Sequence, residues 1–505
     1  MSTEARSNPR DKSALKTYKM YIGGEWVDAQ SGAVFESYNP YTGKPWALIP
    51  RANADDVNRA VEAAHSASRG KWRSMTATQR GAVMRKLADA LVGEAERLAE
   101  IEVRDNGKLY AEMVSQTRYL PEWLYYFAGL ADKIEGAVLP IDKPGNLTMT
   151  RHEPIGVVAA VSPWNSPLIL TMWKLAPALA AGNTIVIKPS EFTSASILEF
   201  CAVAEAAGVP PGVINVVTGF GGEVGGPLVE HPLVGKVAFT GSENTGKVIY
   251  GLAAKSLKRV TLELGGKSAN IIFADANLEN AAKGAVSGIF AAAGQTCIAG
   301  SRLLVQRSVH DQVVDMLVRL GGGAKLGNPM LETTQIGPIC NLPQLDKILS
   351  YIDIARKEGA TAVVGGARPA DPMLKDGWFV EPTIFTGVNN QMRVAREEIF
   401  GPVLSVIPFD DEEEAIAIAN DSPYGLAAGL WTESIARAIR VSEKLESGQV
   451  WVNTYRASSF MAPFGGYKQS GIGREGGQAM IHEYLQVKAV WISTITDVPN
   501  PFIGR

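Results

Sequence analysis

Short apolar runs alternate with longer helical patterns in the middle of the chain. The apolar runs are rich in β-branched residues and stand at 155–161, 184–189, 213–219, 236–241 and 259–264. Helix-length segments such as LILTMWKLAPALAA (168–181) and ASILEFCAVAEAAG (195–208) separate them. Apolar strands separated by helices are typical of a mostly parallel sheet that is buried on both faces. The pattern therefore predicts a doubly wound α/β domain.

Helical periodicity also precedes this region. It appears in residues 54–67 and again in residues 81–107, where Gly107 follows a charged last turn as a stop signal. We expect these helices to cover one face of the sheet.

A second α/β unit follows Glu263. Strand-like runs at 269–276 and 301–306 flank a helix that we expect to end at about Ala292, and helical patterns follow at 309–320, 347–359 and 412–422. This half of the chain carries Cys297.

Two extended segments, 137–153 and 483–494, have no evident place in either core. Apolar and polar residues alternate along LQVKAVWI (485–492), which predicts a half-buried strand. A terminal strand without an internal partner commonly pairs with another subunit. Residues 1–19 are polar and charged without a signal-peptide core, and we interpret them as a loosely attached lead-in.

Length and composition narrow the function classes. The 505 residues, 46% of them hydrophobic, allow roughly three folding units. Lys plus Arg number 49 against 52 acidic residues, and a net charge of −3 argues against nucleic-acid binding. Prolines and polar residues interrupt the most apolar stretch, 154–187, so no membrane partner is expected. Three widely spaced cysteines favour a reducing compartment, which we take to be the cytoplasm.

Two short motifs suggest covalent chemistry. Cys297 lies in the small-residue run GQTC, and Glu263 lies in LELGGKS. A thiolate is a strong nucleophile at neutral pH, and a carboxylate can act as a general base. A lone cysteine is more often a small buried apolar residue, so this interpretation depends on the other motifs.

Seven motifs in order resemble the NAD(P)-dependent aldehyde dehydrogenase superfamily. The motifs are SPWNSPL (162–168), IKPSE (187–191), FTGS with Gly246, LELGGKS, GQTC, EEIFGPV (397–403) and PFGGYKQSGIGRE (463–475). The resemblance as a whole extends over residues 20–492. The resemblance implies an α/β, aldehyde dehydrogenase-like fold with a Rossmann-type cofactor domain (1–131 and 150–262). It further implies a second α/β catalytic domain (263–470) and a small β oligomerisation domain (132–149 and 476–505).

The resemblance also implies the catalytic roles. Cys297 would form a thiohemiacetal with an aldehyde, and Asn165 with the Cys297 backbone N–H would stabilise its oxyanion. After hydride transfer to the cofactor, Glu263 would activate water to hydrolyse the thioester and release a carboxylic acid. Lys174 and Glu475 would relay the proton outward. No metal ligand is assigned.

NAD is the expected cofactor, with NADP as a weaker alternative. The glycine-rich GFGGEVGG (219–226) lacks the third glycine of the common dinucleotide fingerprint, so the assignment rests on the resemblance. Glu191 would bind ribose hydroxyls and repel a 2′-phosphate, and the helix after FTGS would meet the pyrophosphate. The residues that the resemblance assigns to the cofactor are Trp164, Lys188, Ser190, Glu191, Gly241, Ser242, Gly246, Leu264, Glu398 and Phe400.

The substrate is expected to be a small-molecule aldehyde whose identity the sequence does not specify. The residues assigned to its tunnel form a mixed set, namely Leu170, Trp173, Thr296, Ile298, Arg456 and Ser458. Arg456 could favour an aldehyde with a distal carboxylate. Two alternatives are a CoA-acylating semialdehyde dehydrogenase and a catalytically silent structural homologue. We expect a homo-oligomer, with a tetramer favoured over a dimer.

Overall fold

A computed structural model describes residues 15–497 and 500–503, and its main sheet is the predicted parallel one. The strand order is β22-β12-β11-β8-β9-β10-β2-β3. The five strands from β12 to β10 are parallel, and the strands at both edges are antiparallel. In chain order the strands are β2 (Met20–Ile22), β3 (Glu25–Val27), β8 (Val157–Val161), β9 (Thr184–Lys188), β10 (Ile214–Val216), β11 (Val234–Thr240), β12 (Arg259–Glu263) and β22 (Gly471–Ile472).

Both faces of this sheet are buried. Val158 and Ala160 of β8 pack with one group of helices, whereas Val157 and Ala159 pack on the opposite side. The first group is α3 (Ala77–Val92), α4 (Ala95–Asn106), α5 (Tyr110–Leu130), α6 (Pro167–Ala180) and α7 (Ala195–Ala206). The second group is α1 (Ala54–Arg69), α8 (Gly226–Glu230) and α9 (Glu243–Ala254).

The helical pattern at 81–107 belongs to two helices, α3 and α4, which meet at Gly93 and Glu94. Gly107 ends α4 as predicted: it adopts φ 74° and donates its N–H to the carbonyl of Val103. The short α2 (Lys71–Ser74) follows α1.

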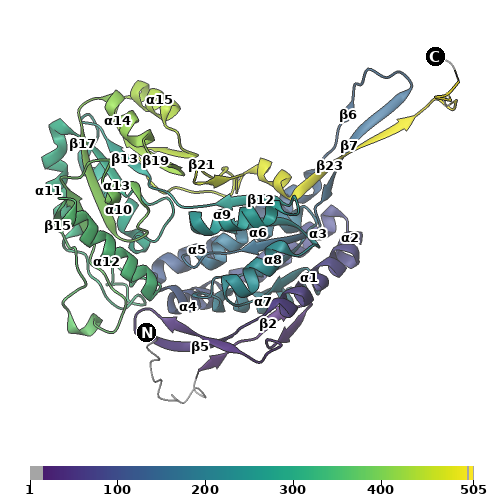
Figure 1. Ribbon diagram of the computed structural model, residues 1–505, viewed down its shortest axis with the longest axis horizontal. Helices are drawn as coiled ribbons and strands as arrows, with labels where there is room; N and C mark the ends of the chain where they lie inside the picture. Colours follow the sequence, from purple (N-terminus) through teal and green to yellow (C-terminus); the bar gives the residue numbers. More distant parts are fainter. Residues whose placement is uncertain (1–14, 498–499, 504–505) are drawn as a thin grey trace.

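The second α/β unit forms a separate lobe (Figure 1), with sheet order β15-β16-β17-β14-β13-β19-β20. Its strands are β13 (Ala269–Ile272), β14 (Arg302–Gln306), β15 (Thr361–Val364), β16 (Thr383–Thr386), β17 (Val403–Phe409), β19 (Ala427–Trp431) and β20 (Gln449–Val452). Only β15 runs antiparallel to its neighbour. Its helices are α10 (Leu278–Phe290), α11 (His310–Gly321), α12 (Leu342–Lys357), α13 (Arg393–Arg396), α14 (Glu412–Asn420) and α15 (Ile435–Lys444).

The two extended segments pair with each other and project as an arm (Figure 1). The arm consists of β6 (Val138–Leu139), β7 (Asn146–Pro154) and β23 (Leu485–Ser493), in the order β23-β7-β6. The expectation that the terminal strand lacks an internal partner is wrong, because β23 pairs antiparallel with β7 along its whole length. The strand is also less buried than its alternation suggests, since Val487 is 63% and Trp491 56% exposed.

The first residues are better anchored than we expected. Residues 1–14 lie outside the described part of the chain, but Lys16–Thr17 form β1, which pairs in parallel with β5 (Lys44–Pro50). The strand β4 (Val34–Asn39) completes this sheet, and β18 (Tyr424–Gly425) pairs with β21 (Tyr467–Lys468). The domain boundaries stay a prediction; β7 spans the one placed at residue 150. Within the described ranges, every helix is too short or too polar to cross a membrane.

Candidate active site

The candidate site lies at the carboxyl ends of β11 and β12, on the side of the main sheet that faces the second lobe. Thr240 and Glu263 are the last residues of these strands and stand side by side in register. The loop that carries Cys297, the nucleophile loop, packs against Gly266 near the end of β12. A Cβ at Gly266 would lie 2.8 Å from the carbonyl oxygen of Cys297. Ligands of parallel α/β sheets commonly bind at this end of the strands.

The loop before Cys297 has an unusual backbone. Helix α10 was expected to reach Ala292 but ends at Phe290, because Ala292 and Ala293 adopt φ 55° and 51°. Contacts from distant segments hold this conformation: the Ala292 N–H donates to Glu112 Oε1 at 2.7 Å, and the Cys340 N–H donates to Gln295 Oε1 at 2.8 Å. Left-handed alanines are unfavourable, and their persistence next to a reactive side chain is typical of a preorganised site.

Cys297 is partly exposed, whereas Cys201 and Cys340 are buried. Burial of the sulfur, together with the carboxylates of Glu263 and Glu398, raises the pKa of the Cys297 thiol to about 12. This pKa favours the neutral thiol near pH 7, so a base is needed to form the thiolate.

Glu263 is a buried carboxyl group with 4% exposure. Neither of its oxygens has a hydrogen-bond partner among the described residues. Burial, reinforced by the nearby Glu475 carboxylate, raises the pKa of Glu263 well above its ordinary value. A carboxylate with a raised pKa is a stronger base, which suits abstraction of a proton from water or a thiol.

Lys174 and Glu475 form a buried ion pair beside Glu263. Lys174 Nζ lies 2.7 Å from Glu475 Oε1, and it also donates to Thr240 Oγ1 at 2.6 Å. The chain thus brings together two residues that are 301 positions apart, as their assignment to one relay requires.

Asn165 and Cys297 line one cavity. The Asn165 amide donates from Nδ2 to the Gln295 carbonyl at 3.0 Å, which fixes its orientation relative to the nucleophile loop. The second Nδ2 hydrogen remains to bind a developing oxyanion.

The same cavity brings together six of the ten residues assigned to the cofactor. They are Trp164, Gly241, Ser242, Leu264, Glu398 and Phe400. Gln344 and Lys347 also line the cavity and were missed by the sequence analysis. Gln344 holds the loop of Phe400 by donating to the carbonyls of Ile399 and Phe400 at 2.7 and 3.0 Å. The sequence gives little indication that Gln344 belongs to the site, because it lies in the first turn of an ordinary helix, α12.

The cavity has the features that a dinucleotide requires. Ser242 caps α9, whose N-terminus offers backbone N–H groups to a phosphate. Gly246 allows close packing, since a Cβ there would lie 2.5 Å from Leu264 Cδ2. Glu398 accepts the Gly266 N–H at 3.0 Å through Oε1 and lines the cavity, where its carboxylate can accept a hydrogen bond from a ribose hydroxyl.

The other cofactor candidates follow β9, the strand next to β8 in the sheet. Lys188 Nζ lies 3.8 Å from a Glu191 carboxylate oxygen. Ser190, which lies between them in the sequence, is buried. Burial lowers the pKa of Lys188, an effect that Glu191 partly offsets. These three residues would meet a part of the cofactor remote from Cys297.

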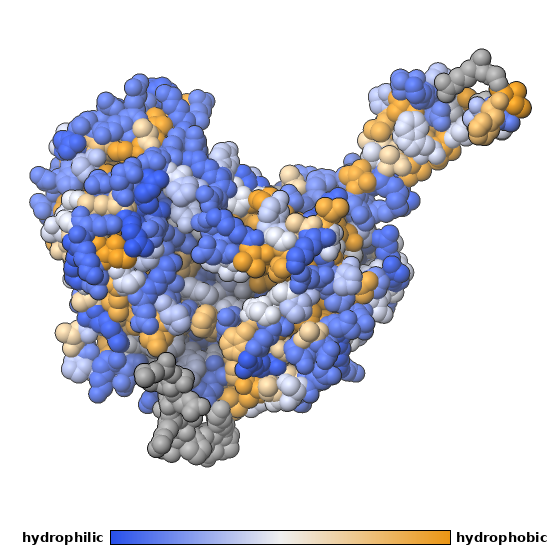
Figure 2. Space-filling model, in the orientation of Figure 1, coloured by the Kyte–Doolittle hydropathy of each residue, from blue (hydrophilic) through white to orange (hydrophobic). Residues whose placement is uncertain are grey.

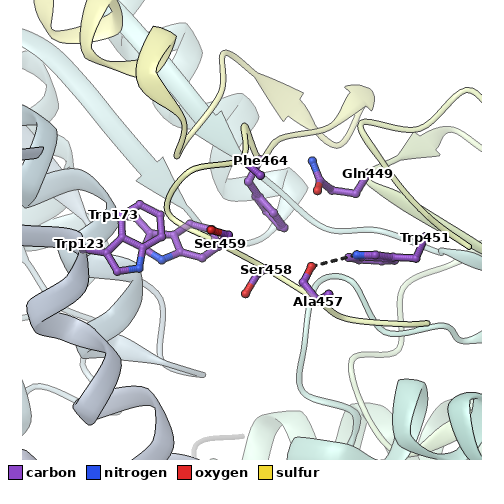
Figure 3. A pocket seen from close by; sticks show the side chains of 9 residues that line it. Trp123, Trp173, Gln449, Trp451, Ala457, Ser458, Ser459 and Phe464 are labelled. Carbon is purple, nitrogen blue, oxygen red and sulfur yellow. Dashed lines mark hydrogen bonds between the residues drawn. The ribbon is translucent and has the colours of Figure 1, made fainter. Parts of the chain in front are cut away.

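A second cavity is largely aromatic (Figure 3). Its lining comprises Trp123, Trp173, Gln449, Trp451, Ala457, Ser458, Ser459, Ala462 and Phe464. The Trp173 ring stacks on Trp123 with centroids 5.1 Å apart and meets the edge of Phe464 at 4.9 Å. Trp173 and Ser458 were assigned to the substrate. Trp123 and Trp451 were missed because they come from separate segments without a motif, and Phe464 was missed although it lies in the PFGGYK motif.

The remaining substrate candidates surround the nucleophile. Leu170 lines the cavity of Cys297, and Ile298 is buried with its carbonyl accepting the Tyr455 hydroxyl at 3.1 Å. Tyr455 in turn contacts Trp451 at 4.9 Å between ring centroids, which links the aromatic cavity to the nucleophile loop. The Arg456 guanidinium donates to the Ser287 carbonyl at 3.2 Å and to the Thr296 hydroxyl at 3.4 Å.

Comparison with known proteins gives a consistent result. Residues 26–490 match the aldehyde dehydrogenase family. A dehydrogenase of (Z)-2-((N-methylformamido)methylene)-5-hydroxybutyrolactone from Acinetobacter baylyi is 45% identical, over 97% of this chain and 100% of its own length. Betaine aldehyde dehydrogenase from Staphylococcus aureus, solved with NAD⁺, has TM-score 0.95 and 41% identity, with 98% of each chain covered. An aldehyde dehydrogenase from Bacillus cereus, also solved with NAD⁺, has TM-score 0.93 and 46% identity, with 97% and 100% covered.

Proposed function

The chain belongs to the aldehyde dehydrogenase family, and we propose that Cys297, Glu263 and Asn165 carry out its NAD-dependent oxidation of an aldehyde to a carboxylic acid. The observation that supports this assignment best is the single cavity lined by Cys297, Asn165 and the nicotinamide-side candidates Glu398 and Phe400. The candidates for nucleophile, oxyanion donor and cofactor ligands thus line the same cavity, which supports the proposal.

The first half of the reaction needs a nucleophile and an oxyanion donor. The Cys297 thiolate adds to the aldehyde carbon, and the Asn165 amide stabilises the negative oxygen of the resulting thiohemiacetal. NAD, when bound, accepts the hydride that this adduct releases. Because the pKa of Cys297 is raised, Glu263 is the group available to take the thiol proton.

The second half is hydrolysis of the thioester. Glu263 takes one proton from a water molecule whose oxygen adds to the thioester carbon, and the C–S bond breaks to free Cys297. The raised pKa of Glu263 suits this role. The presence of a base for water disfavours the CoA-acylating alternative, in which CoA replaces water and such a base is less needed. Addition of CoA should therefore leave the product a free acid.

NAD is the proposed cofactor over NADP. Glu191, beside Lys188, would accept hydrogen bonds from ribose hydroxyls and repel a 2′-phosphate. The S. aureus and B. cereus relatives were both solved with NAD⁺. Three unpaired cysteines suit a reducing compartment such as the cytoplasm.

The aromatic cavity indicates the substrate class. Four aromatic rings, from Trp123, Trp173, Trp451 and Phe464, favour an aldehyde with a bulky apolar tail or a quaternary ammonium group, which binds aromatic faces. One relative of known structure is a betaine aldehyde dehydrogenase. Arg456 supports the rival class, aldehydes with a distal carboxylate, because its guanidinium contacts Thr296 beside the nucleophile.

An aldehyde panel tests both the activity and the substrate class. NADH absorbance is followed with an aromatic aldehyde, a trimethylammonium aldehyde and a semialdehyde acid, and kcat/KM values are compared. Trp451→Leu should lower kcat/KM for the first two by about tenfold or more, whereas Arg456→Ala should affect the semialdehyde acid alone. If no aldehyde gives NADH, the proposed activity is wrong. If Arg456→Ala changes the substrate preference and Trp451→Leu does not, the assignment of the aromatic cavity to the substrate is wrong.

We also propose that the arm joins subunits into a homo-oligomer, with a tetramer favoured over a dimer. Apolar side chains gather along the arm where it projects into solvent (Figure 2). The most exposed of them are Val138 (69%), Val487 (63%) and Trp491 (56%). An apolar surface of this kind on a projecting sheet is typical of a subunit interface.

A further inference from the structure

Helix α6 begins directly after Asn165, and polar side chains from other helices hold its first turn. Ser166 is the N-cap residue, a position where a serine hydroxyl commonly accepts a backbone N–H of the first helical turn. The Ser166 hydroxyl makes no such bond. Glu102 of α4 takes its place, because its Oε1 accepts the Leu168 N–H at 2.8 Å. The Ser166 hydroxyl is therefore available for another partner.

That partner is Lys108, in the connection between α4 and α5. Its Nζ donates to the Ser166 hydroxyl at 2.8 Å, and both residues are buried. Burial lowers the pKa of Lys108 to about 8, an effect that Glu112 opposes and Arg456 reinforces. Among the described residues, neither Lys108 nor Ser166 lines the cavity of Cys297. Because a buried cation must replace the hydrogen bonds of water, the bond from Lys108 holds Ser166 firmly.

The backbone that carries Lys108 is also fixed in place. The Lys108 N–H donates to Asn106 Oδ1 at 2.9 Å, and Gly107 adopts φ 74°. A Cβ at Gly107 would lie 2.7 Å from Pro338 Cγ and 3.1 Å from Pro40 Cβ. This turn therefore requires glycine and packs against two separate segments, so Lys108 extends from a rigid base.

The connection between α4 and α5 contacts the nucleophile loop as well. Glu112, in the first turn of α5, accepts the Ala292 N–H at 2.7 Å. The Cys340 thiol lies 3.9 Å from the carbonyl oxygen of Asp105, and the Cys340 N–H donates to Gln295 Oε1 at 2.8 Å. One short segment of the chain thus holds both the loop of the oxyanion donor and the loop of the nucleophile.

We propose that Lys108 is a positioning residue, which places the Asn165 amide relative to Cys297 by holding Ser166. The inference rests on the proposed role of Asn165 as the oxyanion donor. Such a donor is effective because it stands in position before the charge develops, and a displacement of about 1 Å can cost on the order of 10²-fold in rate. The bond to the Gln295 carbonyl fixes the Asn165 side chain, whereas Lys108 fixes the adjoining backbone.

A double-mutant cycle tests whether Lys108 acts through Asn165. Lys108→Met keeps an unbranched side chain and removes the ammonium group. The variant is made alone and together with Asn165→Ala, and rapid mixing measures the rate of the first NADH turnover at saturating NAD. Lys108→Met with Ser166→Ala replaces both partners by apolar groups, which limits the loss of stability. Ser196→Ala is the control, because its buried hydroxyl donates to Glu102 at 3.4 Å from α7, away from the loop of Asn165.

We expect Lys108→Met, with or without Ser166→Ala, to lower the first-turnover rate by about tenfold while the KM for NAD is unchanged. Ser196→Ala should match the wild type. In the Asn165→Ala enzyme, which is itself slow, Lys108→Met should cause no further loss. Equal losses in both backgrounds, an equal loss in Ser196→Ala, or no loss in the wild-type background would overturn the positioning role. If Asn165→Ala were as fast as the wild type, the proposed donor would be wrong, and the role of Lys108 would fall with it.

Discussion

The Asn165 side-chain amide donates to the carbonyl oxygen of Gln295 at 3.0 Å, two residues before Cys297. This hydrogen bond couples the loop that follows β8 to the nucleophile loop of the second lobe. The amide group is thereby held in place before a substrate arrives, and no reorganisation is needed when the oxyanion forms.

Replacing Asn165 by alanine should therefore affect the transition state more than substrate binding. We expect kcat to fall by about 10²–10³ with a small change in KM. Asn165→Asp keeps the size but places a negative charge toward the oxyanion, so its loss should be larger. A Asn165→Ala enzyme within a few-fold of wild-type kcat would exclude this donor role.

Cys297 and Glu263 should separate the two halves of the reaction. Cys297→Ala should abolish NADH formation, including the first turnover. Glu263→Gln should slow hydrolysis of the thioester by about 10²–10⁴-fold, so rapid mixing should show a burst of NADH before a slow steady state.

The pH dependence provides a control for that experiment. Glu263 acts as a base only when ionised, and its pKa is raised, so the hydrolysis rate of the wild type should increase with pH through that pKa. Glu263→Gln should lose this dependence. Near-normal steady-state turnover of the variant would mean that another group activates the water.

Gly246 should control cofactor binding through packing. An alanine Cβ there would lie 2.5 Å from Leu264 Cδ2, so Gly246→Ala should shift α9 and raise the KM for NAD, with a stability loss of about 1–3 kcal/mol. Gly251→Ala is the matched control on the same helix, because nothing lies within 4 Å of its Cβ position. If thermal unfolding and KM of the two variants agree, the contact with Leu264 has no such role.

Glu191 should set the preference for NAD. Glu191→Thr removes the negative charge that opposes a 2′-phosphate and leaves Lys188 nearby, so the ratio of kcat/KM for NAD over NADP should fall by about tenfold or more. The measurement is a titration of both cofactors at saturating aldehyde. Equal values for both cofactors in the wild type would contradict the assignment.

The arm should determine the oligomeric state. Val487→Asp with Trp491→Asp places charges on its exposed apolar surface, and sedimentation at micromolar concentration should show smaller species than the wild type. Lys488→Ala on the same strand is the control, since its side chain pairs with Glu153 within the chain. A wild-type protein that sediments as a monomer would disprove the proposal.

Much of the fold could be predicted from the sequence, because buried parallel strands have a strong local signal. The runs that contain β8, β9, β11 and β12 are continuous and apolar, and each became a strand of one sheet. The end of α10 could not be predicted, since Ala292 is a good helix former whose left-handed backbone is imposed by contacts with Glu112 and neighbouring segments.

Residues of the candidate site could be predicted from the sequence only where they lie in a recognisable motif. Cys297 and Glu263 lie in distinctive small-residue runs, whereas Trp123 and Trp451 meet only after folding and have no local signature. The alternating pattern of β23 did not identify its partner, because β7 is more than 300 residues earlier and the pattern of a strand does not specify which strand it pairs with. Only the resemblance placed 132–149 and 476–505 in one small β domain.

The ion pair between Lys174 and Glu475 constrains how the protein can be made. Domains tend to fold in order as a chain is synthesised, yet the partner of this early lysine and the strand β22 both belong to the last part of the chain. Until Glu475 has been synthesised, Lys174 lacks the carboxylate with which it pairs in the folded chain. A chain truncated before residue 471 would lack both Glu475 and the strand β22, which pairs with β12 at Glu263, so we expect such a chain to be inactive.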